Sequence, residues 1–144
     1  RGLVITADGE SDKRLREMIR ETEGKDWVVK QVIEEAKNLI NAGQKRIVLD
    51  GLYSWTEYKI LKKEFPGQLT VLAVVVPKAL RHFRVGKRPE RPFNTKEIQE
   101  RDRSEVENLE KGGPIAMADY YVLNDESVAK LHDDVDVILD RIEF

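Results

Sequence analysis

Three short apolar runs, separated by segments with helical periodicity, are the feature that most restricts the fold of this chain. The runs are RIVLD at 46–50, LTVLAVVV at 69–76 and YYVLN at 120–124. Continuous apolar runs of this length indicate strands that are buried on both faces, as in a parallel sheet. Because these strands alternate with helical segments, the sequence predicts an α/β fold of three layers, with helices on both faces of the sheet.

The segments between the apolar runs carry helical spacing and helix-capping residues. The sequence predicts helices over 11–24, 26–43, 54–67 and 94–113, and a last helix that begins at Ser127. Ser54 is followed three residues later by Glu57, which is the pattern of a capping box. We expect Gly112–Gly113 to end the fourth of these helices, because glycine commonly follows the last helical turn.

Length and composition narrow the class of protein further. A chain of 144 residues is expected to form a single domain, and it has no cysteine for a disulfide, a thiolate metal site or a nucleophile. No apolar run has the roughly 18 residues that a membrane span needs, so we expect no membrane partner and a cytoplasmic protein. The two histidines, His82 and His132, are expected to be ordinary surface or boundary residues.

The densest positive charge follows directly after the second apolar run, although the whole chain has a net charge of −2. Residues 78–93 contain four arginines and two lysines. In open parallel sheets, ligands bind beyond the carboxyl ends of the strands. This basic segment falls at that edge, together with Asp50 and Asn124, which end the other two runs. The sequence therefore predicts an anion-binding site there.

The residues themselves leave two interpretations open for this edge. Arginine can hold phosphate oxygens at two points, which favours a phosphate site. Charge alone is equally compatible with a solvated basic helix that pairs with nearby glutamates. Asp50 is a candidate ligand for magnesium or a substrate hydroxyl, but spacing alone favours a residue that ends a strand and caps the next turn.

The chain also resembles a known family, through pieces that occur in a fixed order. They are IVLDGLYSWTEYKILKKEF, VLAVVVPKALRHFRVGKR and ERDRSEVENLEKGGPIAMADYYVLNDES, and the stretch GGPIAMADYYVLND is the most distinctive. The series is similar to the small P-loop kinases of the dephospho-coenzyme A kinase and adenylate kinase type, and most of all to their bacterial and archaeal relatives. The resemblance implies a P-loop NTPase-like fold and an enzyme that transfers phosphate from ATP with Mg²⁺. The acceptor would be a small molecule of the dephospho-coenzyme A or nucleoside monophosphate class.

The resemblance implies roles for individual residues and makes residues 85–94 a lid-like loop. The catalytic residues would be Arg84, Arg88 and Asp50, with Asp50 also an indirect magnesium ligand. The acceptor would be bound by Arg16, Arg20 and Arg81. The nucleotide would be bound by Arg101, Arg103 and Asn124.

The chain departs from this family at its start. The family begins with a strand, a P-loop and a helix, but the pattern G-x-x-x-x-G-K-[ST] does not occur here. The absent strand is normally the central one, between the strands that end at Asp50 and Val76. We therefore expect residues 1–144 to be an N-terminally incomplete kinase-like domain that is inactive by itself.

The absence of the P-loop pattern leaves an alternative function open, and the absence of the central strand raises the question of whether the chain assembles with another copy. The alternative is a non-catalytic nucleotide-binding or assembly module that has lost its P-loop. An open strand edge invites pairing with another chain, so a homo-oligomer or a strand-swapped dimer is expected as a further state. Nucleic acid is disfavoured as a partner, because the chain is acidic overall and aromatic residues are not interleaved with the basic ones.

Overall fold

The computed structural model describes residues 18, 22–24, 26–90 and 92–144. The chain divides into two compact units, Arg1–Leu49 and Asp50–Phe144. None of the helices that the structure describes has the length and apolar character of a membrane span.

The first unit contains one long described helix, α2, at Trp27–Asn41. It confirms the helix predicted over 26–43, and its buried residues Val29, Ile33 and Ala36 fall on one helical stripe. Gly43 follows with a φ of +94°, a conformation that glycine adopts without strain. The helix predicted over 11–24, with Arg16 and Arg20, lies almost wholly outside the described residues.

The predicted strand at 46–50 is wrong for the described part of the chain. These residues pair with no described strand, and Val48 is 77% exposed. A strand in a sheet needs a neighbouring strand to accept and donate its backbone hydrogen bonds, so an apolar run without such a neighbour remains a connector. The run also ends at the boundary between the two units.

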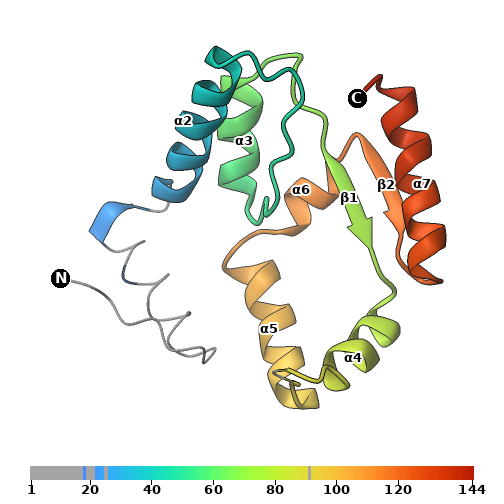
Figure 1. The fold of residues 1–144 in the computed structure, drawn as a ribbon. Coiled ribbons are helices and arrows are strands. Elements are labelled where there is room, and N and C mark those ends of the chain that lie inside the picture. The colour runs from blue at the N-terminus through green and yellow to red at the C-terminus, as the bar shows by residue number, and fades with distance from the viewer. Residues whose placement is uncertain (1–17, 19–21, 25, 91) are drawn as a thin grey trace. The chain divides into compact units, whose positions relative to one another are not determined.

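The second unit is built around a small parallel sheet. Its strands are β1 at Leu72–Val75 and β2 at Tyr120–Leu123, in register from Leu72 opposite Tyr120 to Val75 opposite Leu123. Figure 1 shows the two strands side by side, with α7 next to β2. The predicted parallel pairing is confirmed. The sheet that the structure describes has two strands, and the predicted three-layer fold is not established.

One carboxylate fixes the beginning of both strands. Asp119 accepts a hydrogen bond from the Val71 amide at 2.7 Å and lies 3.2 Å from Lys62 Nζ. Lys62 Nζ also donates to the Leu69 carbonyl at 3.0 Å. Burial opposes ionisation of Asp119, but these donors outweigh it and lower the pKa of Asp119. The contacts anchor the end of one helix to the start of the sheet.

That helix is α3, at Trp55–Glu64, and it confirms the predicted capping box. Ser54 Oγ accepts from the Glu57 amide at 3.2 Å, and the Glu57 carboxylate accepts from the Ser54 amide at 2.9 Å. The helix buries Tyr58 and packs against α6, at Gly112–Ala116. The Tyr58 hydroxyl donates to the Met117 carbonyl just after α6, at 3.3 Å.

The helix predicted over 94–113 is two helices, and Gly112–Gly113 do not end it. The helix α5 covers Thr95–Glu107 and begins with a capping box from Asn94. The chain then turns through Glu110, whose φ of +51° cannot continue a helix, and α6 begins at Gly112. Proline is accommodated in the first turn of a helix, where its missing amide has no partner to lose, which suits Pro114.

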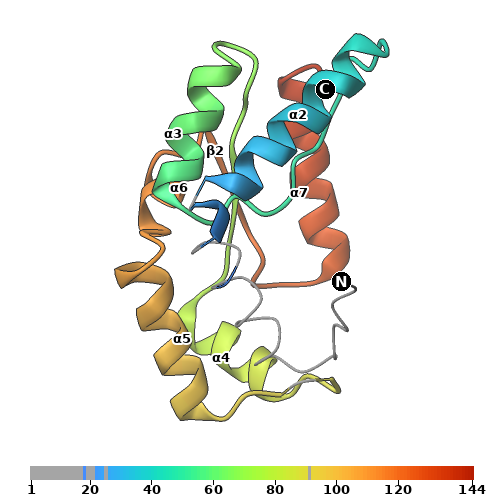
Figure 2. The ribbon, with the colours of Figure 1, turned by 90° about the vertical axis from the view of Figure 1, so that its left-hand side faces the viewer.

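Two more helices complete the second unit. The helix α4 covers Lys78–Gly86 and packs against α5, as both views in Figures 1 and 2 show. The last helix, α7, covers Val128–Arg141, and Ser127 Oγ accepts from the Lys130 amide at 3.1 Å. Its predicted start is therefore confirmed. It packs against β2 with Ile138 buried.

Candidate anion site at the carboxyl edge of the sheet

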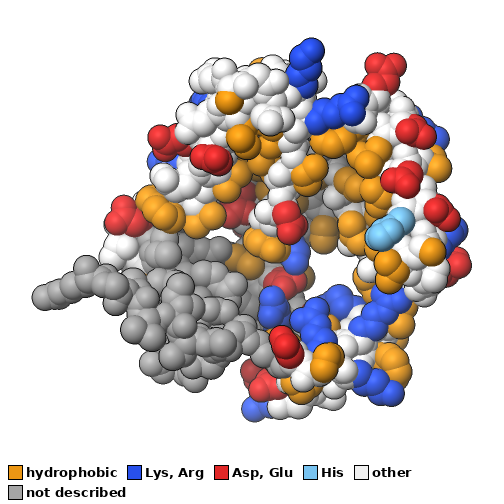
Figure 3. Space-filling view, viewed as in Figure 1, with side chains coloured by type: hydrophobic (Ala, Val, Ile, Leu, Met, Phe, Trp, Pro, Cys, Tyr) orange, Lys and Arg blue, Asp and Glu red, His pale blue; other side chains and the backbone are white. Residues whose placement is uncertain are grey.

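Both strands end at the same edge, where α4 begins. The Asn124 amide donates to the Val75 carbonyl at 2.8 Å, which extends the ladder by one bond beyond the last strand pair. Pro77 then leads into α4, which confirms that the basic segment follows the carboxyl end of β1. Figure 3 shows Lys and Arg side chains gathered around α4.

Arg84 and Asn124, two of the predicted site residues, meet at this edge. Arg84 Nη1 donates to the Asn124 carbonyl at 2.6 Å and to Asn124 Oδ1 at 2.9 Å. Arg84 Nη2 donates to the Glu126 carbonyl at 3.3 Å. All three acceptors are neutral, so the contacts fix the guanidinium against the loop after β2 without cancelling its charge.

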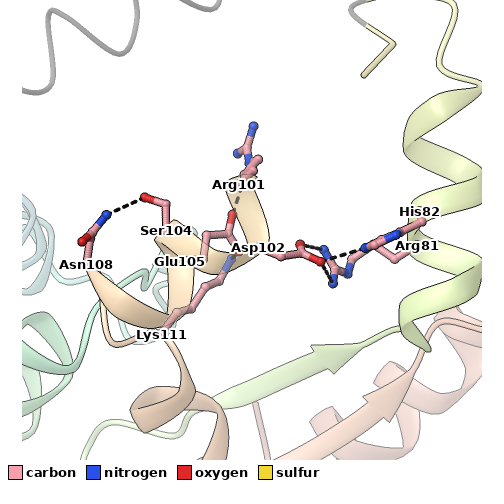
Figure 4. A network of polar contacts seen from close by, with 8 residues as sticks. All are labelled: Arg81, His82, Arg101, Asp102, Ser104, Glu105, Asn108 and Lys111. Atoms are coloured by element: carbon pink, nitrogen blue, oxygen red, sulfur yellow. Dashed lines mark hydrogen bonds and ion pairs between the residues drawn. The ribbon is translucent and has the colours of Figure 1, made fainter. Parts of the chain in front are cut away.

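Arg81 points instead toward α5, where it meets Asp102 (Figure 4). Both terminal nitrogens of Arg81 donate to the Asp102 carboxylate, Nη2 at 2.9 Å from Oδ2. His82 Nε2 lies 2.7 Å from the same Oδ2. Hydrogen bonds from Arg81 hold the pKa of Asp102 well below its usual range, although partial burial opposes this, and His82 adds to the lowering.

Arg101 belongs to a different cluster on α5, also drawn in Figure 4. Its Nε donates to Glu105 Oε1 at 3.2 Å, and Lys111 Nζ lies 3.1 Å from Glu105 Oε2. Burial alone would raise the pKa of Glu105, but Lys111 and then Arg101 lower it overall. Arg101 also lies over the Phe93 ring, 5.7 Å from its centroid. Its charge is therefore engaged within α5.

Arg88 and Arg103 are exposed, and among the described residues no carboxylate forms a salt bridge with either side chain. Lys87, next to Arg88, lies 4.3 Å from the centroid of the exposed Phe83 ring. Of the predicted cationic residues in the described part of the chain, these two arginines are the ones left open to a ligand.

Asp50 lies at the start of the second unit with an exposed side chain. The next residue, Gly51, has a φ of +99°, a conformation that glycine adopts without strain. Among the described residues, Asp50 forms no hydrogen bond or ion pair with Arg84 or Asn124, and no group of three or more potential metal ligands occurs there. Arg16 and Arg20 fall outside the described residues.

Sequence reasoning missed Asp102 as the partner of the basic segment. Asp102 lies 21 residues from Arg81, so no local spacing rule connects the two. The available signal was the pair of helices itself, because two helices joined by a short linker place their facing side chains in contact. His82 is a boundary residue as expected, but it also contributes to the contact with Asp102.

The fold and the edge define a mixed α/β protein with an arginine-rich segment beyond two parallel strands. No model of a known protein family matches the chain. A UPF0200 protein of Pyrococcus abyssi is 33% identical over 147 residues, which is 100% of this chain and 76% of the relative. UPF0200 proteins of Sulfurisphaera tokodaii and Thermococcus kodakarensis are 33% and 30% identical and are covered over 73% and 76% of their lengths.

The chain therefore belongs to the UPF0200 family. All three relatives come from archaea, as part of the expected resemblance did, and the expected relationship to P-loop kinases stays a prediction. The family name describes no reaction.

Proposed function

We propose that this protein is an ATP-dependent phosphotransferase for a small acceptor of the dephospho-coenzyme A or nucleoside monophosphate class. The observation that carries the proposal is the junction of Arg84 with Asn124 at the carboxyl edge of two parallel strands. Ligands of open parallel sheets bind at this edge. Phosphoryl transfer needs mainly positioning and positive charge, which an arginine-rich edge can supply.

The two arginines Arg84 and Arg88 would have different roles at this edge. Arg84 has neutral partners, so it offers its full charge from a fixed position. Arg88 lies four residues further along, exposed and without a carboxylate partner among the described residues. In this proposal Arg84 sets the potential at the edge, and Arg88 approaches the transferred phosphate.

Magnesium would be held mainly by the phosphates of the nucleotide. Mg²⁺ keeps several waters and needs only one or two carboxylates when phosphates supply the other ligands. Asp50 fits such an indirect role, because its carboxylate is exposed and is in no salt bridge with a described residue. Bound Mg²⁺ would neutralise charge that develops on the transferred group.

For the fold, we propose a P-loop NTPase-like sheet in which a further strand lies beside β1. Among the described residues β1 pairs on one side alone, and Val74 on it is 54% exposed. A two-stranded sheet is marginal in water, and a third strand would cover the free edge.

Binding and turnover of ATP by the full-length protein test this proposal. We expect ATP with Mg²⁺ to raise its melting temperature by mass action, and a small acceptor to support formation of ADP. Arg88→Ala is expected to lower turnover by roughly 10³ with little change in folding stability. The matched control is Lys63→Ala, which removes an exposed charge at the far end of α3.

The outcomes separate the two functions that the sequence leaves open. Binding of ATP without transfer to any acceptor would support the non-catalytic module instead. If Arg88→Ala and Lys63→Ala turn over at the same rate, Arg88 has no part in the reaction. If the full-length protein neither binds nor consumes ATP, the proposal is wrong.

A further inference from the structure

The two arginines on α4 hold partners of different charge. Arg84 binds neutral oxygens of Asn124 and Glu126, whereas Arg81 binds the carboxylate of Asp102. Residues three apart on a helix are neighbours on its surface. The helix therefore presents one guanidinium whose charge is retained and, beside it, one whose charge is cancelled.

Asp102 occupies an arrangement of donors that suits an anion. Two nitrogens of Arg81 and Nε2 of His82 converge on its two oxygens, and all three donors come from α4. An ionised carboxylate only accepts hydrogen bonds, so His82 carries a proton on Nε2 in this contact. A planar guanidinium accommodates phosphate oxygens in the same two-point geometry as a carboxylate.

The acceptor, in contrast, comes from α5. Among the described residues, Asp102 is the one side chain that forms ion pairs from α5 to α4. The other carboxylate cluster on α5, at Glu105, binds Arg101 and Lys111. Release of Asp102 would therefore remove the charged link between the two helices while Arg84 still holds α4 at the sheet.

We propose that Asp102 masks an anion cradle formed by Arg81 and His82, and that a phosphate-bearing ligand displaces it. This inference rests on the proposed function, because it adds a means of regulation at the same edge. The mask lowers the affinity for polyphosphate in the unliganded protein. Binding exchanges one charged partner of Arg81 for another and frees α5 from α4.

Inorganic tripolyphosphate is the probe, titrated calorimetrically into the full chain at low ionic strength. Asp102→Asn removes the competing charge and is expected to tighten binding about fivefold, the upper end of the range for exposed ion pairs, because this pair is bidentate and only partly exposed. The matched control is Asp134→Asn, which changes the net charge equally but removes the partner of Lys130 on α7. We expect less than about a twofold change in the control, since its charge lies outside the cradle.

A second measurement needs no variant. The chain has two histidines, His82 in the cradle and His132 exposed on α7. We expect tripolyphosphate to shift the imidazole nitrogen resonances of His82 in the wild-type chain and to leave those of His132 in place. This readout keeps the proposal testable if Asp102→Asn fails to fold.

Each outcome decides the matter. Tighter binding by Asp102→Asn alone, with a selective shift at His82, supports the mask. Equal or weaker binding by Asp102→Asn relative to Asp134→Asn, an unmoved His82 signal, or no binding by any form overturns it. None of these results refutes phosphotransfer, which is decided separately by ATP binding and turnover of the full-length protein.

Discussion

Gly113 allows α6 to lie against α3, and replacing it with alanine is expected to destabilise the protein. A Cβ atom at this position would lie 2.7 Å from Cε3 and 3.0 Å from Cδ2 of the Trp55 indole. The indole is rigid and stacks on Tyr58 with ring centroids 5.1 Å apart, so it has little freedom to move away. The added methyl group must therefore shift a helix or a ring.

The expected cost follows from two opposing effects. Overpacking of this kind costs about 2–3 kcal/mol. Alanine in place of glycine returns at most about 1 kcal/mol, because Gly113 lies in the first turn of α6 and directly precedes Pro114. The net loss in free energy of unfolding for Gly113→Ala is therefore about 1–2 kcal/mol.

Gly112→Ala is the matched control, because a Cβ there meets no atom within 4 Å. The two substitutions are chemically identical and adjacent, so their effects on the unfolded chain nearly cancel. We expect Gly112→Ala to be neutral or slightly stabilising. Urea unfolding should place the two midpoints roughly 0.5–1 M apart, with similar slopes.

The indole can be tested as the cause by a double-mutant cycle. In a Trp55→Leu background, Gly113→Ala should cost at least 1 kcal/mol less, roughly, than in the wild-type chain, because the obstructing ring is gone. If the Gly112 and Gly113 variants are equally stable, or if the cost persists without the indole, the close packing of α6 on α3 is not as described.

Two further predictions concern the polar contacts that define the second unit. Ser54→Ala removes the hydroxyl that accepts from the Glu57 amide, and it should lower the free energy of unfolding by about 1 kcal/mol in denaturant titrations, whereas an unchanged midpoint would contradict the cap. The lowered pKa of Asp119 means that its contacts with Val71 and Lys62 stabilise the fold fully above the unfolded pKa of about 4 and lose this effect as pH falls through the lower folded pKa. Asp119→Asn should therefore destabilise the protein at neutral pH and approach the wild type in acid, and a difference that is constant with pH would refute this.

Local patterns predicted the starts of α3, α5 and α7, because their caps are formed by residues close in sequence, but they did not predict α4 and α6 as separate helices. The capping boxes at Ser54 and Asn94, and the cap at Ser127, require partners three residues away. Strand length and number depend on partners that are distant along the chain. The run at 46–50 has the composition of a buried strand but no described strand beside it, so composition alone could not decide its structure.

Gly112–Gly113 failed as a helix stop for a related reason. The spacing of α5 ends at Glu107, and the turn at Glu110 depends on a positive φ that few residues adopt and that no pattern around it predicts. Gly113 is then explained by the distant Trp55 ring rather than by helix termination. The role of Gly113 therefore depends on a tertiary contact between α6 and α3, which local sequence patterns do not reveal.

The candidate site was predictable in position but not in the pairing of its charges. The parallel strands and the charge after β1 place the basic helix at the carboxyl edge, and the Arg84–Asn124 contact agrees with that expectation. Helical spacing predicts that Arg81 and Arg84 share a face. It could not predict that Arg81 finds a carboxylate 21 residues further along, because that contact depends on how α4 packs against α5.

The ion pair between Arg81 and Asp102 reduces the positive charge that the basic segment presents at the edge of the sheet. Counting residues suggests a strongly basic segment, but Asp102 neutralises Arg81, and Arg84 is fixed by neutral carbonyl oxygens. The field at the edge therefore comes mainly from Arg84 and from exposed side chains such as Arg88. Fields of exposed charges are screened within about 8 Å at physiological salt, whereas the fixed and half-buried guanidinium of Arg84 is screened less. The proposed anion binding at this edge should consequently weaken with salt but persist, as long as the Arg84–Asn124 junction is intact.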